Sequence, residues 1–162
     1  LPNQNHVLSY KNHNQLIHLL KYKNIQSLKV PLGILLNEYF KKNIDPNKQY
    51  ILIPIPLHKK RLRTRGFNQV ALIAQEVTKL NKNIQINTSL KRIIYTKQQV
   101  KLKKQKRLQN AHNIFCINDI SLKNKNIILF DDVKTTGATL NSAKQEIKKL
   151  RPKTIKVISF LK

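Results

Sequence analysis

The sequence contains a single cysteine, Cys116, and no methionine or tryptophan. One cysteine cannot form an internal disulfide or a zinc cluster, which excludes a secreted disulfide scaffold and favours a cytoplasmic location. No apolar run reaches the roughly 18 residues that a membrane-spanning helix needs, so we expect a soluble protein with no membrane insertion. Because the chain starts at Leu1 and no apolar signal segment opens it, we expect a removed or unsequenced stretch before it.

Acidic residues are also scarce, with 7 Asp and Glu against 32 Lys and Arg, which gives a formal net charge of +25. Such a charge attracts polyanions such as nucleic acid or phosphorylated ligands. The abundance of Lys, Asn and Ile is equally typical of an AT-rich genome, in which lysine occupies solvated positions without a binding role. The charge alone leaves both interpretations open, but an adjacent pair of acids in this chain requires an explanation.

The 162 residues are enough for one domain, 1–162, with a sizeable core. Apolar residues at helical spacing predict two helices within the first 40 residues and further helices over 68–80 and 140–150. Runs of Ile and Leu predict strands over 50–55, 126–130 and 155–160. Strands that alternate with helices favour a parallel α/β sheet covered on both faces.

Two basic segments lie between these elements. The first, LHKKRLRTRG at 57–66, follows two prolines, and we interpret it as a loop. The second, 97–107, has little apolar content and is predicted to be an exposed, mobile loop. No aromatic residue is interleaved with either basic run, so the sequence gives no sign of base stacking.

The segment IILFDDVKTTGATL carries the strongest chemical signal. A buried strand brings Asp131 and Asp132 to its carboxyl end, where open α/β sheets bind ligands. TTGAT, 135–139, then precedes a helix, so backbone N–H groups and the positive helix end form an anion cradle sized for a phosphate. A sugar phosphate satisfies the acids and the cradle together. In the alternative interpretation, the acids start a turn and Thr136 or Thr139 caps the last helix.

The strand, acid pair and TTGxT resemble the phosphoribosyl pyrophosphate motif of the type I phosphoribosyltransferases. Within that superfamily the chain is similar to the ComF group, which is associated with competence for DNA uptake. YKNHNQLIHLLKYK, IPIPLHKKRLRTRGFNQVALIA and TKQQVKLKKQKRLQNAHNIF also match the pattern of that group. Members often begin with a cysteine-rich zinc ribbon, and nothing of this kind is present in the sequence.

The resemblance implies a type I phosphoribosyltransferase fold, with a mainly parallel five-stranded sheet flanked by helices. A small N-terminal helical hood, 1–45, would precede a core over 46–162. It also implies a Mg²⁺-dependent site for 5-phosphoribosyl-1-pyrophosphate, with the metal held mainly by the substrate and by Asp131 and Asp132 through water. These two acids match the catalytic pair that binds the ribose hydroxyls.

The resemblance assigns further residues to four parts of the site. The 5′-phosphate loop comprises Thr135, Thr136, Gly137, Ala138 and Thr139. Lys134, beside this loop, departs from the family pattern and either helps to bind the phosphate or points to solvent. The pyrophosphate loop comprises Pro56, Leu57, His58, Lys59 and Lys60. The mobile loop contributes Gln99, Lys103, Lys104 and Arg107. Arg65, Asn68 and Gln69 form a second shell or contact the acceptor, although Asn68 is equally suited to helix initiation.

Two functions from different classes fit these residues. In the first, the protein is a phosphoribosyltransferase, a pentosyl-transferring enzyme, whose basic loops stabilise the departing pyrophosphate. In the second, a non-catalytic module uses the phosphoribosyl site as a sensor and binds single-stranded DNA through its basic face. Other competence proteins are the macromolecular partners that the resemblance suggests.

Overall fold

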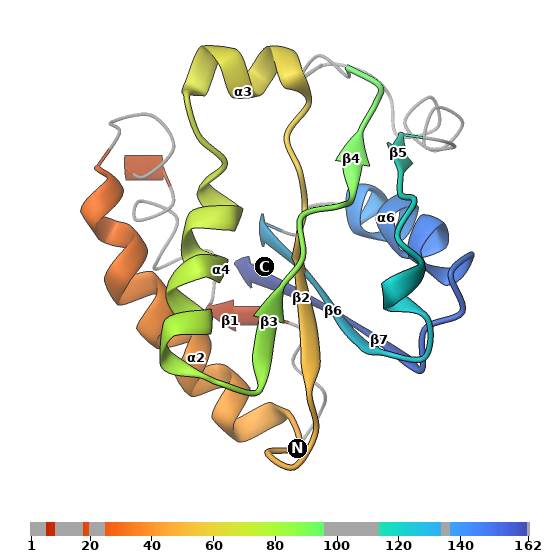
Figure 1. Cartoon of the computed structure of the whole chain (residues 1–162). Helices are drawn as coiled ribbons and strands as arrows, with labels where there is room; N and C mark the ends of the chain where they lie inside the picture. The colour runs from red at the N-terminus through yellow and green to blue at the C-terminus, as the bar shows by residue number, and fades with distance from the viewer. Residues whose placement is uncertain (1–5, 9–17, 20–24, 96–113, 134–136, 162) are drawn as a thin grey trace.

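The computed structural model describes residues 6–8, 18–19, 25–95, 114–133 and 137–161 (Figure 1). Within them, five strands form one sheet in which every neighbouring pair is parallel, in the order β1-β7-β6-β2-β3. The strands are β1 (His6–Leu8), β2 (Tyr50–Pro54), β3 (Ile84–Ile86), β6 (Asn126–Val133) and β7 (Thr154–Leu161). The predicted strands over 50–55, 126–130 and 155–160 are thus the three central strands.

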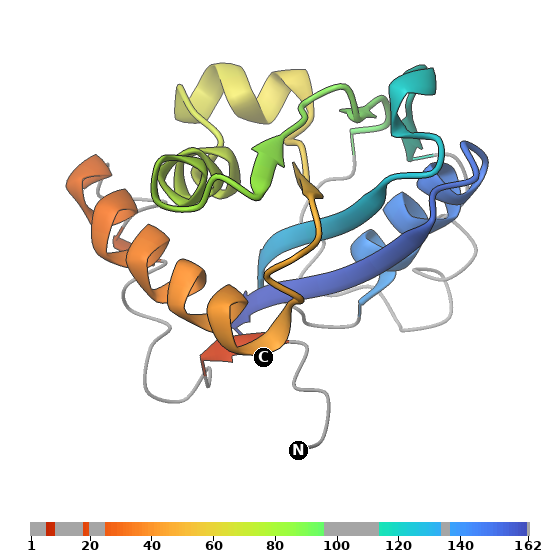
Figure 2. The same ribbon diagram turned by 60° about the horizontal axis from the view of Figure 1, so that its bottom comes forward.

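Helices cover both faces of this sheet, as Figure 2 shows most clearly. On one face lie α2 (Lys29–Asn43) and α4 (Gln69–Leu80), and on the other lies α6 (Ala138–Lys148). Successive residues of β6 alternate between the two cores, since Ile128 and Phe130 pack with α2 and α4 whereas Ile127 and Leu129 pack with α6. This alternation explains why the central strands are apolar throughout.

The basic segment at 57–66 is a helix, α3 (Lys59–Arg65), so its interpretation as a loop is wrong. The composition of the segment gave no sign of a helix, because Leu62 is the only apolar residue in α3 and no α3 residue is buried. The ends of the helix explain its formation: the His58 side chain caps the first turn, and the chain leaves the last turn at Gly66. In Figure 1, α3 lies beyond the carboxyl end of β2.

A second sheet joins β4 (Lys91–Arg92) to β5 (Phe115–Cys116) as an antiparallel pair. In the sequence, β4 precedes and β5 follows the segment 96–113, which contains the predicted mobile loop and lies outside the described residues. Of the predicted hood, 1–45, β1 is an edge strand of the main sheet and α2 packs against α4. The described parts of the hood therefore belong to the layers of the sheet.

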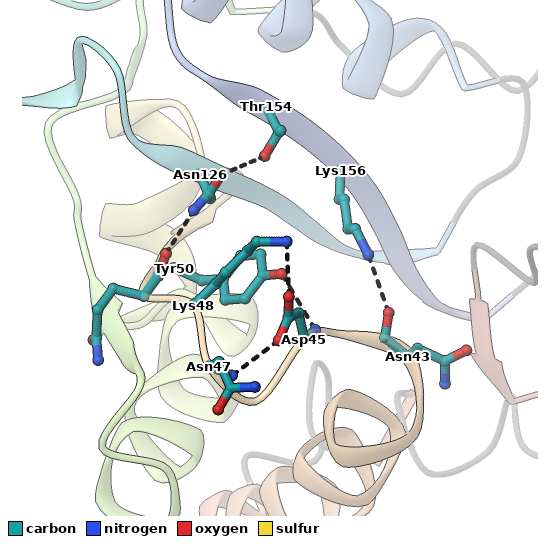
Figure 3. A network of polar contacts seen from close by, with 9 residues as sticks. Asn43, Asp45, Asn47, Lys48, Tyr50, Asn126, Thr154 and Lys156 are labelled. Carbon is teal, nitrogen blue, oxygen red and sulfur yellow. Dashed lines mark hydrogen bonds and ion pairs between the residues drawn. The ribbon is translucent and has the colours of Figure 1, made fainter.

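Polar contacts join the amino ends of the sheet strands to one another and to the end of α2 (Figure 3). The acid pair lies at the opposite, carboxyl end of β6. The Thr154 hydroxyl donates to Asn126 Oδ1 over 3.0 Å, which links β7 to β6. Lys156 Nζ donates to the Asn43 carbonyl over 3.0 Å, which attaches the end of α2 to β7. Asp45, in the turn between α2 and β2, pairs with Lys48 over 2.7 Å. These contacts fix the edge of the sheet that is remote from the candidate site.

Helices α2 and α4 approach each other closely at Gly33. A Cβ at this position would lie 2.5 Å from the Cβ of Glu76, which is nearer than side chains tolerate. We expect Gly33→Ala to force the helices apart and to lower the free energy of unfolding by about 1–3 kcal/mol. The gain in helix propensity, ~1 kcal/mol, offsets only part of this loss. Urea unfolding measures the change, and an equal or higher midpoint for the variant would contradict the close contact.

Among the residues described, no helix is both long enough and apolar enough to cross a membrane.

Candidate functional site

Both acids of the pair lie within β6, at its carboxyl end. Asp131 is in register with Ser159 of β7, and the strand continues to Val133. The alternative in which the acids start a turn is therefore wrong. Because successive strand residues face opposite sides, Asp132 lies on the α4 side with 6% of its surface exposed, whereas Asp131 is half-buried on the other side. The backbone N–H of Asp132 donates to Asp131 Oδ1 over 2.9 Å.

The predicted second shell reaches the acid pair through Gln69, the first residue of α4. The Gln69 amide Nε2 donates to Asp132 Oδ2, and the Gln69 Oε1 accepts from Arg65 Nη1 over 2.6 Å. Arg65 is the last residue of α3, so the three side chains connect two helices to the strand. The structure thus joins Arg65 to Asp132 through Gln69. The sequence alone did not identify Asp132 as the partner of Gln69.

Asn68 starts α4, as one of its two interpretations predicted. Its Oδ1 accepts from the Val70 N–H over 3.1 Å, and its Nδ2 donates to the Ile55 carbonyl over 3.0 Å. The second hydrogen bond attaches the beginning of α4 to the chain just beyond β2. Asn68 therefore fixes the helix end on which Gln69 lies.

The residues of the predicted pyrophosphate loop lead into α3 and form its beginning. Pro56, Leu57 and His58 are half-buried, and Lys59 and Lys60 are exposed in the first turn of the helix. His58 Nδ1 accepts from the Lys60 N–H over 3.2 Å, so its described contact is a helix cap. The positive charge that was expected on a loop is carried on the surface of a helix.

Arg92 and Tyr95 are two residues that sequence reasoning missed. Burial lowers the pKa of the Arg92 guanidinium below its ordinary value, the charge of Arg61 lowers it further, and Asp131 acts in the opposite direction. The charge of Arg92, in β4, thus interacts with those of Arg61 in α3 and Asp131 in the acid pair. The β-branched Ile93 and Ile94 and the aromatic Tyr95, which follow Arg92 directly, are the signal that favours a strand here.

Tyr95, at the end of this segment, is 41% exposed and lies against α3. Its ring centroid is 5.2 Å from that of His58, and Lys60 Nζ lies 5.6 Å from the Tyr95 centroid. The fold therefore places an exposed aromatic ring beside the basic helix, which the spacing of residues along the sequence did not indicate.

Of the predicted 5′-phosphate loop, Gly137, Ala138 and Thr139 are described. Gly137 has a φ of 74°, in the left-handed region that favours glycine, and it is the N-cap of α6. The N-cap position is thus occupied by a residue without a side chain, and Thr139 lies within the first turn, so the prediction of a Thr139 cap is wrong. Lys134, Thr135 and Thr136 lie outside the described residues, as do Gln99, Lys103, Lys104 and Arg107 of the mobile loop.

The described residues contain no group of three or more His, Cys, Asp or Glu side chains that could hold a metal ion. Mg²⁺ commonly keeps several waters and binds to one or two carboxylates together with substrate phosphates. The acid pair fits that mode of binding, with Asp131 as the more exposed carboxylate.

No family model matches the chain. Competence protein ComFC of Bacillus subtilis is 39% identical over 100 residues, which cover 62% of this chain and 39% of that protein. Competence protein F of Haemophilus influenzae is 33% identical over 108 residues, which cover 65% of this chain and 47% of that protein. The chain thus spans less than half the length of these two relatives.

Solved structures show a similar fold at low sequence identity. The allosteric regulatory enzyme of purine biosynthesis matches 82% of this chain and 26% of its own, at 10% identity and a TM-score of 0.50. A hypoxanthine phosphoribosyl transferase of Trypanosoma cruzi matches 85% of this chain and 64% of its own, at 15% identity and a TM-score of 0.47. The architecture predicted from the sequence, a mainly parallel five-stranded sheet flanked by helices, is confirmed.

Proposed function

We propose that this chain, a phosphoribosyltransferase-like member of the ComF family of competence proteins, binds 5-phosphoribosyl-1-pyrophosphate together with Mg²⁺. One observation carries the proposal: β6 holds both carboxylates at the edge of the sheet where α3 and the β4 end supply cations. The carboxyl edge of a parallel sheet is the usual place for a ligand in this class of fold.

The ribose would occupy the acid pair. Ionised carboxylates accept hydrogen bonds and therefore suit two adjacent sugar hydroxyls. Asp131 and Asp132 lie on opposite faces of one strand, and the packing of β6 between β2 and β7 restricts their movement. In pentosyl transfer their contribution is mainly to orient the ribose.

The two phosphate-bearing ends of the ligand would lie on either side of this strand. The start of α6, at Gly137, would accept the 5′-phosphate, because the positive end of the helix dipole favours an anion there. The cations of α3 and Arg92 would face the pyrophosphate and stabilise the charge that develops when its bond to C1 breaks and the electron pair leaves with it. Bound Mg²⁺ would neutralise part of the same charge.

Calorimetric titration tests the proposal. We expect saturable binding of 5-phosphoribosyl-1-pyrophosphate that requires Mg²⁺, and weaker binding of inorganic tripolyphosphate, which carries a polyphosphate but no ribose. Equal binding of the two compounds would indicate a general polyanion surface and would overturn the proposed ribose site.

The second candidate function is the binding of single-stranded DNA, and the position of Tyr95 supports it. Proteins that bind single strands combine a positive surface with aromatic rings on which bases stack. Tyr95 and the exposed Lys59, Lys60 and Arg63 of α3 form such a surface, which we call the α3–Tyr95 surface. Because it adjoins the proposed pyrophosphate region, the two ligands should compete.

A further inference from the structure

Gln69 is a buried polar residue with two charged partners. It is 3% exposed, donates to Asp132 and accepts from Arg65. An ionised carboxylate only accepts hydrogen bonds and a guanidinium only donates them, so an amide is suited to stand between the two. A carboxylate at position 69 could not donate to Asp132, and a lysine could not accept from Arg65.

The position of Gln69 is itself fixed on two sides. The backbone of α4 begins at this residue, and the neighbouring Asn68 holds the helix start to the Ile55 carbonyl. From the other direction, the bond from Arg65 joins Gln69 to the last residue of α3. Asp132 is therefore held by an amide whose location depends on both β2 and α3.

We infer that Gln69 is a positioning residue that sets the orientation of the Asp132 carboxylate, and that Arg65 holds Gln69 in place. The inference rests on the proposed function, because it assigns to the chain Arg65–Gln69–Asp132 a role in ribose binding. The chain also connects the ribose end of the site to α3, the helix that carries the cations proposed for the pyrophosphate end. Gln69 needs no contact with the ligand for this role.

The test compares Gln69→Met with the unaltered protein. Methionine has a similar length but neither donates nor accepts at the amide positions. We expect affinity for 5-phosphoribosyl-1-pyrophosphate and for ribose 5-phosphate to fall about ten- to a hundredfold, the usual effect of one hydrogen bond to a charged group. Affinity for magnesium pyrophosphate, which has no ribose, should change by less than about threefold. Calorimetry measures all three.

Two further variants separate positioning from folding. Gln75→Met makes the same exchange at an exposed position of α4 and should bind all three ligands normally. Arg65→Met removes the hydrogen bond that supports Gln69, and Arg65 is only half-buried. We expect this variant to lose affinity for the same two ribose-containing ligands, by a smaller factor, and it provides the test if Gln69→Met does not fold.

The outcomes distinguish this inference from the proposed function. Failure of the unaltered protein to bind 5-phosphoribosyl-1-pyrophosphate overturns both. Normal binding by that protein and by the folded variants at positions 69 and 65 overturns the inference alone. An equal loss for ribose 5-phosphate and magnesium pyrophosphate indicates a general structural role and also overturns it.

Discussion

Replacing both acids, Asp131→Asn with Asp132→Asn, should lower the affinity for 5-phosphoribosyl-1-pyrophosphate by roughly two to four decades. Each hydrogen bond to a charged group contributes about 1.5–3 kcal/mol, and two neighbouring bonds are not fully additive. Asparagine has nearly the shape of aspartate, so the strand and its pairing with β7 should persist. Calorimetric titration in the presence of Mg²⁺ gives the affinity, and thermal unfolding shows whether the double variant is folded.

The matched control for this experiment is Asp45→Asn. Asp45 lies at the opposite edge of the sheet, where it pairs with Lys48, so its loss removes one acid without touching the candidate site. Affinity in this variant should equal that of the unaltered protein. If the double variant at the acid pair also bound normally while folded, the assignment of the ribose to these carboxylates would be wrong.

Binding of single-stranded DNA should weaken steeply as salt rises. Each phosphate contact on a single strand contributes about −0.7 to the slope of log affinity against log salt, so about four to six contacts give roughly −3 to −4. Between about 50 and 200 mM salt the affinity then falls about a hundredfold. Fluorescence anisotropy with a short oligodeoxythymidine measures the slope, and a slope near zero would exclude DNA binding through phosphate contacts.

Variants of the α3–Tyr95 surface locate the binding site. Lys59→Ala, Lys60→Ala and Arg63→Ala together should reduce the magnitude of the slope by about 2. The same loss of charge at the amino edge of the sheet, through Lys123→Ala, Lys125→Ala and Lys153→Ala, should leave it nearly unchanged. If both triple variants left the slope nearly unchanged, or reduced it equally, the charge would be acting as a diffuse field, in line with the interpretation of the lysines as a product of an AT-rich genome.

Tyr95 has its own test, because stacking does not depend on salt as phosphate contacts do. Loss of one base–aromatic contact costs about 1–3 kcal/mol, so Tyr95→Ala should weaken binding of the oligonucleotide by roughly 5- to 150-fold. Tyr95→Phe keeps the ring and should bind like the unaltered protein. Equal affinity of the two variants would remove Tyr95 from the DNA surface.

The central part of the fold was predictable because its apolar pattern is continuous. The β2 and β6 runs are buried on both faces, and α4 repeats Val70, Ile73 and Val77 at helical spacing. The short strands were not predictable in this way: β3 has three residues, β4 has two, and their places depend on partners elsewhere in the chain. Helix α3 escaped prediction because capping residues, and not an apolar stripe, define it.

The candidate site likewise contains residues that the sequence could identify and residues that only the folded chain brings together. Asp131 and Asp132 could be identified because a strand, two acids and a turn follow one another without interruption. The partners of Asp132 could not, since Gln69 is remote in the sequence and the contact exists only once α4 packs on β6. Tyr95 escaped notice for the same reason, because the folded chain and not the spacing of residues brings it to Lys60.

The strand order has a consequence for how the chain acquires this site during synthesis. Strand β6, which carries the acid pair, lies between β2 and β7, and its register with β7 runs from Asn126 to Val133. A ribosome delivers β2 and α4 before β6 and delivers β7 after it, so one edge of β6 stays unpaired until β7 has emerged. Premature termination before Thr154 would therefore leave the acid-bearing strand paired with β2 alone, and its exposed second edge would favour aggregation over function.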